Sequence, residues 1–480
     1  MSLEDAMRQT TRQLELPFDW RGETSIVERS GEASTANHGN ERSGSNGECL
    51  MELVVERSNA ITALKRVQSN KGSPGIDGMI VQELSKYLKE NWPSVRAQLL
   101  AGTYQPRPVR RQSIPKNGGG TRELGIPCVL DRFIQQAILQ VLQPRFDPTF
   151  SEHSYGFRPG RRAHDAVRAA QAYIQEGRRW VVDVDLEKFF DRVNHDVLMG
   201  RLAHRIADRR MLGLIRRYLE AGILADGVVI ERHEGTPQGG PLSPILANVL
   251  LDEVDKELEK RGYAFARYAD DCNVYVRSRH AAERAMNTLR RLYAKLRLRI
   301  NESKSTIGRP WDRKFLGYSF WAAKGNTVKL RIAEKSRETM KTRVRQLTRR
   351  TRGRSIPSVI AELRVFLTGW KNYFQLAQTP GIFRGLDEWI GHRLRALQLK
   401  QWKNGTTIFS ELRARGLNER DAKAMACCTG HWWRYASNPS IGIALPSSYF
   451  EQLGLPKLAA DLNSPNRRMR TRTSGGVGGA

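Results

Sequence analysis

Cysteine, long apolar runs and negative charge are all scarce in this sequence. The five cysteines, Cys49, Cys128, Cys272, Cys427 and Cys428, are few and odd in number, so reduced thiols are the simplest interpretation. No apolar run approaches the ~18 residues of a membrane-spanning helix. The N-terminus, MSLEDAMRQT, carries acidic residues and no apolar core, so neither secretion nor organelle import is indicated. These absences favour a cytoplasmic protein.

Zinc is also disfavoured. Cys427, Cys428 and His431 stand close together, but no second cysteine pair accompanies them at the spacing of a zinc site.

The shortage of acidic residues leaves a large positive excess. The 480 residues hold 79 Lys and Arg against 50 Asp and Glu, a formal net charge of +29. The first 50 residues contain 5 basic and 9 acidic side chains, so the remaining 430 carry +33. A surface of this sign favours a polyanion, and nucleic acid fits better than a membrane. We therefore expect a nucleoid-associated protein with no membrane partner.

Composition divides the chain into four parts. Residues 1–50 are rich in Ser, Gly, Asn and Glu and are expected to form a disordered leader. Residues 51–330 mix helix and strand patterns, residues 331–450 are predominantly helical, and residues 451–480 form a short basic flexible tail. Apolar periodicity and turn signals predict helices over 53–67, 131–146, 281–298 and 358–374, a helix starting near Ser243, a strand over 180–186, and a hairpin over 110–127.

Two adjacent carboxylates, Asp270 and Asp271, stand out within the stretch FARYADDCNVYV. An isolated Asp-Asp pair is typical of a solvated turn. Here apolar β-type runs flank the pair and carry it into the body of a sheet, where unpaired carboxylates repel and are costly to bury. A divalent cation that neutralises the pair resolves the conflict, and oxygen-only ligands suit Mg²⁺.

A third carboxylate can come from WVVDVDLEKFFD. Asp183 and Asp185 project from the same strand face, and Asp185 lies at the strand end, where a ligand is better reached. The alternative for Asp185 is a helix N-cap. Two metal ions held by such carboxylates activate a hydroxyl and stabilise a leaving pyrophosphate. The pattern predicts phosphoryl transfer with two Mg²⁺ ions, or with Mn²⁺ as a substitute.

Phosphoryl transfer also needs cations and close backbone approach. Lys116 and Arg122 flank the Gly-rich turn Gly118–Gly120, and EGTPQGGPLSP supplies further glycines. Arginine can hold phosphate oxygens with two hydrogen bonds, and glycine lets the backbone approach a nucleotide. Ordinary turn chemistry is the alternative for either loop.

Taken in order, the motifs DLEKFF, GTPQGGPLSP and YADD resemble the palm motifs of reverse transcriptases. The blocks SYGFRPGRRAHDAV, NESKSTIG, FLGYSF and FLTGWKNYF are most similar to group II intron-encoded reverse transcriptase/maturase proteins, over about residues 55–455. The resemblance implies an α+β fold. It consists of a right-hand polymerase with fingers and palm, made of an antiparallel sheet plus helices, and a following all-α thumb or maturase region.

The resemblance also implies roles for individual residues. It assigns metal binding to Asp185, Asp270, Asp271 and the backbone carbonyl of Leu186. It assigns nucleotide binding to Lys116 and Arg122 at the triphosphate, Phe190 against a 2′-hydroxyl, Gln238 in the pocket, and Lys304 near the leaving pyrophosphate as a general acid. From the residues alone, Phe190 could instead be a core aromatic and Lys304 a solvated lysine.

The helical region has its own charge excess. Residues 331–420 contain 20 Lys and Arg but only 7 Asp and Glu, interleaved with aromatics. A one-signed excess predicts RNA contact, for which we select Arg393, Arg395, Lys400 and Lys403, whereas the aromatics suit a helix core.

The implied function is an RNA-directed DNA polymerase that binds its group II intron RNA, assists splicing and copies the intron during mobility. Its partners would be template RNA with a DNA primer, deoxynucleoside triphosphates and target DNA. No cysteine-rich endonuclease follows, so the chain resembles the endonuclease-lacking bacterial branch and would rely on another DNA end for priming. Two alternatives remain: a reverse transcriptase recruited to antiviral defence or CRISPR spacer acquisition, and a non-catalytic splicing maturase.

Overall fold

The computed structural model describes residues 49–115, 121–225, 228–230, 234–237, 239–427 and 430–459. The leader expected over 1–50 and the tail expected over 451–480 therefore lie almost entirely outside the described residues. Among those that are described, no helix has both the length and the apolar character needed to cross a bilayer.

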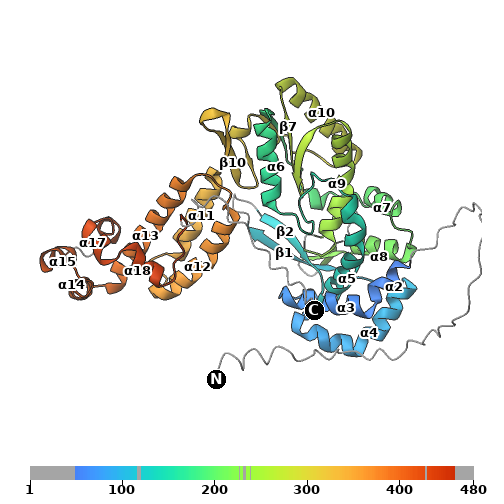
Figure 1. Ribbon diagram of the computed structural model, residues 1–480. Coiled ribbons are helices and arrows are strands. Elements are labelled where there is room, and N and C mark those ends of the chain that lie inside the picture. Colours follow the sequence, from blue (N-terminus) through green and yellow to red (C-terminus); the bar gives the residue numbers. More distant parts are fainter. Residues whose placement is uncertain are drawn as a thin grey trace, which may run out of the picture. The chain divides into compact units, whose positions relative to one another are not determined.

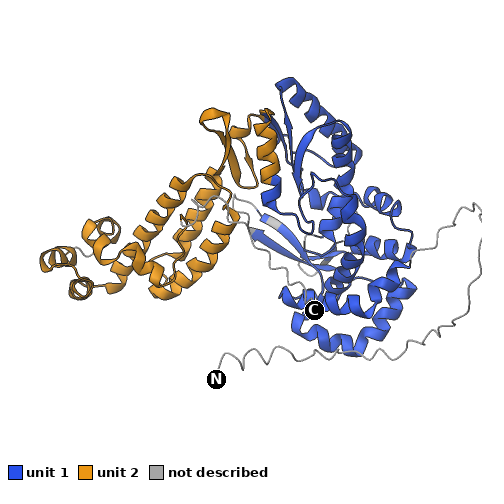
Figure 2. Cartoon of the chain, in the orientation of Figure 1, with its two compact units in different colours: residues 1–166, 180–307 blue, residues 167–179, 308–480 orange. Residues whose placement is uncertain are grey.

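The chain forms two compact units, each described here by itself (Figure 2). The first holds residues 1–166 and 180–307, and the second holds residues 167–179 and 308–480. The sequence predicts a change of architecture at 330–331, whereas the chain passes into the second unit at 307–308. The reason is that the strands after residue 308 pair with one another in a separate sheet.

The first unit contains most of the strands and a set of long helices (Figure 1). Its helices are α2 (Leu50–Val55), α3 (Arg57–Ser69), α4 (Leu84–Ala101), α5 (Val129–Phe146), the start of α6 (Ala163–Gln175), α7 (His195–Ala203), α8 (Arg209–Glu220), α9 (Ser243–Lys260) and α10 (Arg279–Lys295). Its strands are β1 (Val109–Pro115), β2 (Thr121–Ile126), β3 (Trp180–Val184), β4 (Ile223–Ala225), β5 (Val228–Ile230), β6 (Ala264–Tyr268), β7 (Asp271–Val276) and β8 (Thr306–Gly308).

Two four-stranded sheets organise this unit. One has the order β2-β1-β4-β5, and the other has the order β6-β7-β3-β8. Helix α10 packs on β3 and β7, and α9 packs on β6, through buried side chains such as Leu250, Val254 and Leu289. Both flanks of the β6–β7 hairpin are buried, so its turn is held at the edge of a packed core.

One predicted helix is interrupted. The pattern over 53–67 predicts a continuous helix, but α2 ends at Val55 and α3 begins at Arg57. Glu56 between them has φ −59° and ψ 142°, which is extended backbone. Its carbonyl still accepts a hydrogen bond from the Ala60 N–H, so Glu56 is the N-cap of a second helix.

The second unit combines a small sheet with helices. Its strands are β9 (Lys314–Phe315), β10 (Tyr318–Ala322) and β11 (Val328–Ile332), in the order β11-β10-β9. The second half of α6 belongs here, and its Gln171 side chain donates to the carbonyl of Val328 at 2.7 Å. The helices are α11 (Glu334–Leu347), α12 (Ile356–Tyr373), α13 (Pro380–Trp402), α14 (Gly405–Ala414), α15 (Glu419–Ala426), α16 (Trp432–Tyr435), α17 (Pro439–Ala444) and α18 (Ser447–Gln452).

Five short 3₁₀ segments among the described residues complete the structure: η2 (Val81–Glu83), η3 (Asp147–Thr149), η4 (Phe189–Asp191), η5 (Pro310–Asp312) and η6 (Lys324–Asn326). Residues 185–188 connect the end of β3 to the start of η4.

Candidate active site

The register of two strand pairs brings the predicted carboxylates together. Strands β6 and β7 are antiparallel, with Tyr268 opposite Asp271, so Ala269 and Asp270 form the turn between them. Strand β3 is antiparallel to β7, with Val184 opposite Cys272. The next residues along this register are Asp185 and Asp271, and residues opposite each other in an antiparallel pair are typically ~5 Å apart between Cα atoms. Chain segments far apart in sequence thus converge at one sheet edge.

Asp185 is fixed by its backbone. Its N–H donates to the Ser305 hydroxyl at 3.0 Å, and its carbonyl accepts from the Asn301 N–H at 2.8 Å. The Lys304 ammonium lies 3.8 Å from the Asp185 carboxylate, with side chains 64% and 39% exposed, respectively. NESKS therefore anchors the Asp185 backbone and brings the Lys304 ammonium beside the Asp185 carboxylate.

Leu186 presents its carbonyl to the β7 side. It forms an isolated antiparallel bridge with Ile300, flanked by the hydrogen bond from the Glu187 N–H to the Arg299 carbonyl. In such a bridge the flanking residues make the hydrogen bonds, and the bridge residue's own N–H and C=O point the opposite way. The Leu186 N–H and C=O therefore point away from Ile300, toward the side of β3 on which β7 lies.

The donor set fits a hard divalent cation, although no preformed cluster exists. Among the described residues, no group of three or more His, Cys, Asp and Glu is arranged to hold a metal ion. Without a cation, converging carboxylates repel, and here the Lys304 ammonium lies beside one of them. Burial raises the pKa of the Cys272 thiol to about 12, so this neighbour of Asp271 stays protonated and does not supply a thiolate ligand.

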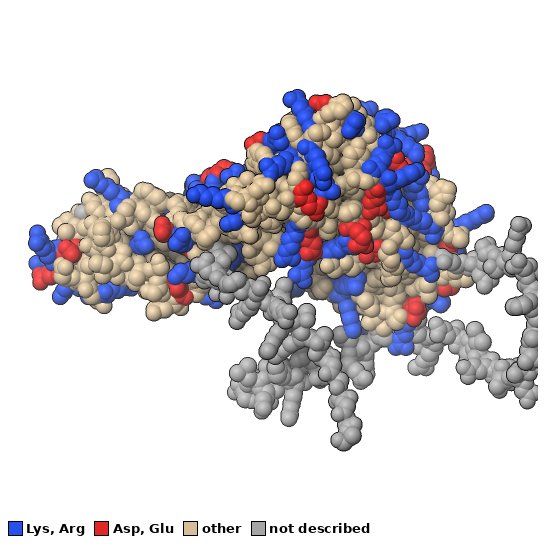
Figure 3. Space-filling model, turned by 45° about the horizontal axis from the view of Figure 1, so that its top comes forward, with Lys and Arg blue, Asp and Glu red and all other residues tan. Residues whose placement is uncertain are grey.

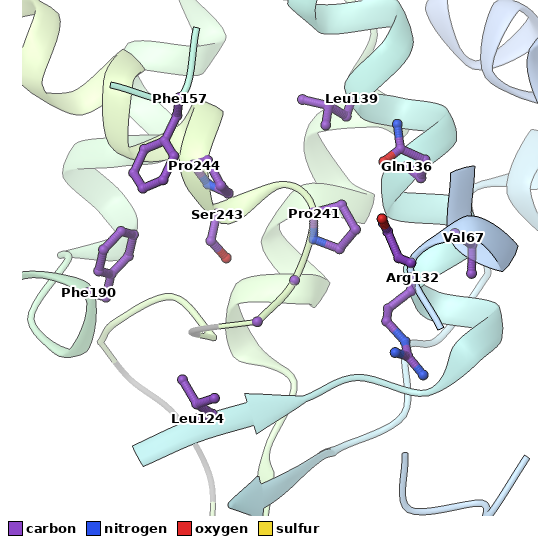
Figure 4. A pocket seen from close by; sticks show the side chains of 13 residues that line it. Val67, Leu124, Arg132, Gln136, Leu139, Phe157, Phe190, Pro241, Ser243 and Pro244 are labelled. Atoms are coloured by element: carbon purple, nitrogen blue, oxygen red, sulfur yellow. The ribbon is translucent and has the colours of Figure 1, made fainter. Parts of the chain in front are cut away.

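A pocket of about 540 Å³ opens in the first unit (Figure 4). Phe190 and Phe157 face each other across one part of it, and Leu124 of β2 lies at another. The remaining lining residues are Val67, Asn70, Arg132, Gln136, Leu139, Gly239, Gly240, Pro241, Ser243 and Pro244. The pocket thus joins the aromatic of DLEKFF to the loop of GTPQGG.

Glycines let this loop approach the aromatic. The Thr236 N–H donates to the Phe190 carbonyl at 2.7 Å. Gly235 has φ +91°, and a Cβ there would lie 2.8 Å from the carbonyl oxygen of Asp191. Gly239 has φ +139°, and its Cβ would lie 2.7 Å from the Gly125 carbonyl oxygen. Only glycine combines these backbone angles with such close contacts.

Three predicted nucleotide contacts remain open. Lys116 and Gln238 lie outside the described residues. Arg122 lies on β2 opposite Ile114, at the end of the hairpin that leads into the Gly-rich turn. The backbone therefore places this hairpin in the first unit with the pocket, and Phe190 is the predicted contact that lines the pocket.

Arg132, Gln136 and Phe157 line the pocket and were not predicted. Arg132 donates to the Ser73 carbonyl at 2.6 Å, and burial lowers its pKa. Phe157 has φ +60° and is 43% exposed, an uncommon state for a large aromatic residue. The only signal in the sequence was their place in DRFIQQ and SYGFRPG, where the helical pattern and the turn residues explain them equally well.

The basic residues selected in α13 differ in their surroundings. Arg393 donates to the Thr348 hydroxyl at 2.7 Å and lies over the rings of Trp389 and Trp433, and burial lowers its pKa. Arg395 donates to the Leu445 carbonyl at 3.2 Å. Both guanidinium groups therefore brace the second unit. Lys400 is partly buried, and Lys403 is exposed at the end of α13.

Comparisons with known proteins match two parts of the chain to described families. Residues 114–320 match the family described as reverse transcriptase (RNA-dependent DNA polymerase), and residues 337–416 match the group II intron, maturase-specific domain. Protein YkfC of Escherichia coli (strain K12) is 33% identical over 299 residues, covering 54% of this chain and 78% of that protein.

A second relative shares less of its length. The group II intron-encoded protein LtrA of Lactococcus lactis subsp. cremoris is 38% identical over 195 residues, which cover 40% of this chain and 32% of LtrA. The chain therefore spans about a third of this relative. Among solved structures, the partial Cas6-RT-Cas1–Cas2 complex is 26% identical, with 54% of this chain and 46% of that chain covered and a TM-score of 0.34.

Proposed function

The chain belongs to the group II intron reverse transcriptase and maturase family, and from this premise we propose that it is an RNA-directed DNA polymerase that also binds its intron RNA, assisting splicing and intron mobility. One observation carries the proposal: the pairing of β3 with β7 ends at Val184 and Cys272, the direct neighbours of Asp185 and Asp271, and Asp270 lies in the turn between β6 and β7.

Asp185, Asp270, Asp271 and the Leu186 carbonyl would hold two Mg²⁺ ions, with Mn²⁺ as a substitute. When bound, these ions activate the primer 3′-hydroxyl and stabilise the leaving pyrophosphate. Lys304, near the Asp185 carboxylate, balances its charge and is available to donate a proton from Nζ to the pyrophosphate.

The pocket would receive the incoming deoxynucleoside triphosphate. Phe190 would exclude the 2′-hydroxyl of a ribonucleotide, since its ring forms part of the wall opposite Phe157. Lys116, Arg122 and Gln238 would complete the contacts to the triphosphate and base. Their support is the resemblance of IPKNGGGTRELGIP and TPQGG to the family's motifs.

The second unit would hold the template–primer duplex and the intron RNA. Residues 331–420 of this unit hold 20 Lys and Arg against 7 Asp and Glu. Figure 3 shows Lys and Arg side chains on both units, more of them over the first than over the second. A distributed positive surface suits phosphate contacts, which carry no sequence information by themselves. Template RNA, primer DNA and target DNA would all be bound in this way, in the cytoplasm at the nucleoid.

Primer extension on an RNA template tests the proposal. The wild-type protein is expected to extend a DNA primer with deoxynucleotides and Mg²⁺, and Asp270→Ala and Asp185→Asn are expected to abolish extension while circular dichroism stays unchanged. Glu283→Gln, which removes an exposed carboxylate paired with Arg279, is the matched control. Extension by Asp270→Ala at the wild-type rate would show that the active-site assignment is wrong.

A further inference from the structure

An arginine with no exposed surface lies directly behind the acidic turn. Arg267 on β6 and Asp255 on α9 are both 0% exposed. The Arg267 Nε–H donates to Asp255 Oδ1 at 2.8 Å, and Nη2 donates to Oδ2 at 2.5 Å. Removing two such charges from water costs several kcal/mol, and an apolar pair of similar volume is often as stable. Stability alone therefore does not explain this ion pair.

The other donors of Arg267 explain it better. Nη1 donates to the Ala269 carbonyl at 2.9 Å and to the Asn248 side-chain oxygen at 3.0 Å. Nη2 also donates to the Ser154 hydroxyl at 2.6 Å. Ala269 is the first residue of the β6–β7 turn, so its carbonyl belongs to the peptide group that leads into Asp270. The guanidinium thus connects α9 and the segment around Ser154 to the acidic turn.

The turn needs such support because its backbone is unfavourable. Ala269 has φ +58°, in the left-handed region that costs non-glycine residues roughly 1–2 kcal/mol. Gly156 packs against it so closely that a Cβ there would lie 2.2 Å from the Ala269 nitrogen. The Asn248 amide holds Gly156 in place by donating to its carbonyl at 2.9 Å.

The same segment continues into the pocket. The Arg267 N–H donates to the His153 carbonyl, and the Tyr155 N–H donates to the Arg267 carbonyl, both at 2.9 Å. Residues 153–155 therefore lie alongside β6. Two residues later, Phe157 forms part of the pocket wall opposite Phe190 (Figure 4).

We propose that Arg267 is a positioning residue that holds the peptide between Ala269 and Asp270 in the orientation needed for cation binding and links that turn to the Phe157 wall of the pocket. This inference rests on the proposed function, because it concerns the same carboxylates. Arginine suits the role because its planar fork directs fixed N–H groups to Asp255, Asn248, Ser154 and Ala269 at once.

The substitution Arg267→Lys keeps the positive charge but removes the planar guanidinium group and its fixed set of N–H donors. Electron paramagnetic resonance measures Mn²⁺ binding to the purified full chain directly. In the absence of nucleic acid and nucleotide, this measurement is independent of activity. Arg267→Lys is expected to weaken Mn²⁺ binding by roughly tenfold to a hundredfold, as removal of partners that orient metal ligands commonly does. Extension at saturating nucleotide should need a correspondingly higher Mg²⁺ concentration.

A charge-removed double variant separates positioning from folding. Arg267→Met with Asp255→Leu removes the ion pair as a unit, so its stability is expected to return close to that of the wild type. Mn²⁺ binding should nevertheless stay weak, because the Ala269 carbonyl still lacks its donor. Recovery of both stability and Mn²⁺ binding in the double variant would overturn the proposal.

Two controls complete the experiment. Arg210→Lys alters another multiply paired arginine, which is bonded to Glu52 on α2 and to Asp208, the N-cap of its own helix α8. This substitution should leave Mn²⁺ binding unchanged. Asp270→Asn should remove Mn²⁺ binding. If the wild type shows no binding that depends on Asp270, the metal site of the proposed function fails. If it shows such binding and Arg267→Lys binds equally well, only the inference about Arg267 fails.

Discussion

At the scale of single residues, Asp131 is a buried carboxylate that forms no ion pair with another residue in the described part of the chain. It is 1% exposed and accepts hydrogen bonds from the hydroxyls of Tyr104 at 2.9 Å and Tyr218 at 3.3 Å, and from the Arg107 N–H at 3.2 Å. Burial outweighs these bonds and raises the pKa of Asp131 to about 6, from 3.8. The folded state therefore holds the proton more tightly than the unfolded chain does.

The sign of the resulting pH dependence follows directly. Below pH 4 both states are protonated, and between pH 4 and 6 the unfolded chain loses its proton first, so Asp131 stabilises the fold less as pH rises. The loss over this window is on the order of 2–3 kcal/mol. We expect the unfolding free energy of the wild type, relative to that of Asp131→Asn, to be higher at pH 5 than at pH 8. Urea titrations of both proteins at the two pH values measure this difference. Groups that titrate elsewhere cancel in this difference, and a difference independent of pH would contradict the assignment.

At the scale of structural elements, the loop Gly235–Pro241 depends on close packing against η4. Gly235→Ala adds a Cβ 2.8 Å from the Asp191 carbonyl oxygen at φ +91°. We expect a loss of roughly 1–3 kcal/mol in unfolding free energy and a higher KM for deoxynucleotides, because the loop must move away from Phe190. Steady-state primer extension at varied nucleotide concentration measures the KM.

Gly262→Ala is the matched control for this loop. Gly262 has φ +71°, but a Cβ there meets nothing within 4 Å. It should lose stability through the backbone angle alone and keep the wild-type KM. An equal change of KM in both variants would mean that backbone strain, and not the contact with η4, determines nucleotide binding.

Sequence patterns predicted elements best where one feature dominated. Apolar periodicity predicted α5, because burial of one helix face follows directly from it, and a run of β-type residues predicted β3. The break at Glu56 was missed because the apolar spacing continues across it and only the backbone angle interrupts the helix. In α12 the aromatic residue Tyr373, of a type expected in the helix core, is 37% exposed, while Ile360 and Leu367 are buried.

For the candidate site, the sequence likewise indicated some features and missed others. The convergence of Asp185 with the 270–271 pair stays a prediction, which the pairing of β3 with β7 up to Val184 and Cys272 supports. The support from Arg267 was not predicted, because a buried arginine is recognised only when its partners, Asp255, Asn248 and Ser154, are known. Ring contacts of Arg393 with Trp389 and Trp433 were hidden for the same reason.

At the scale of the whole molecule, the positive excess should govern RNA affinity. With 79 basic against 50 acidic residues, many phosphate contacts are available. We expect the logarithm of the association constant for single-stranded RNA to fall linearly with the logarithm of KCl concentration, with a slope of about −0.7 per phosphate contact. Filter binding of the wild type and of Asp270→Ala should give equal slopes, since one acidic residue at the palm edge hardly changes the total. An affinity that ignores salt would exclude a phosphate-dominated surface.

The order in which the ribosome delivers this chain differs from the order in which its units become complete. Residues 167–179 emerge early, yet Gln171 and Gln175 make hydrogen bonds to Val328, and Arg179 accepts one from Arg309. During synthesis, more than a hundred further residues must be added after residues 167–179 before the hydrogen-bond partners of this stretch have been made. A chimaera that exchanged only the residues after 308 between homologues would separate them from their partners in residues 167–179. Such an exchange should therefore succeed only when residues 167–179 are exchanged as well.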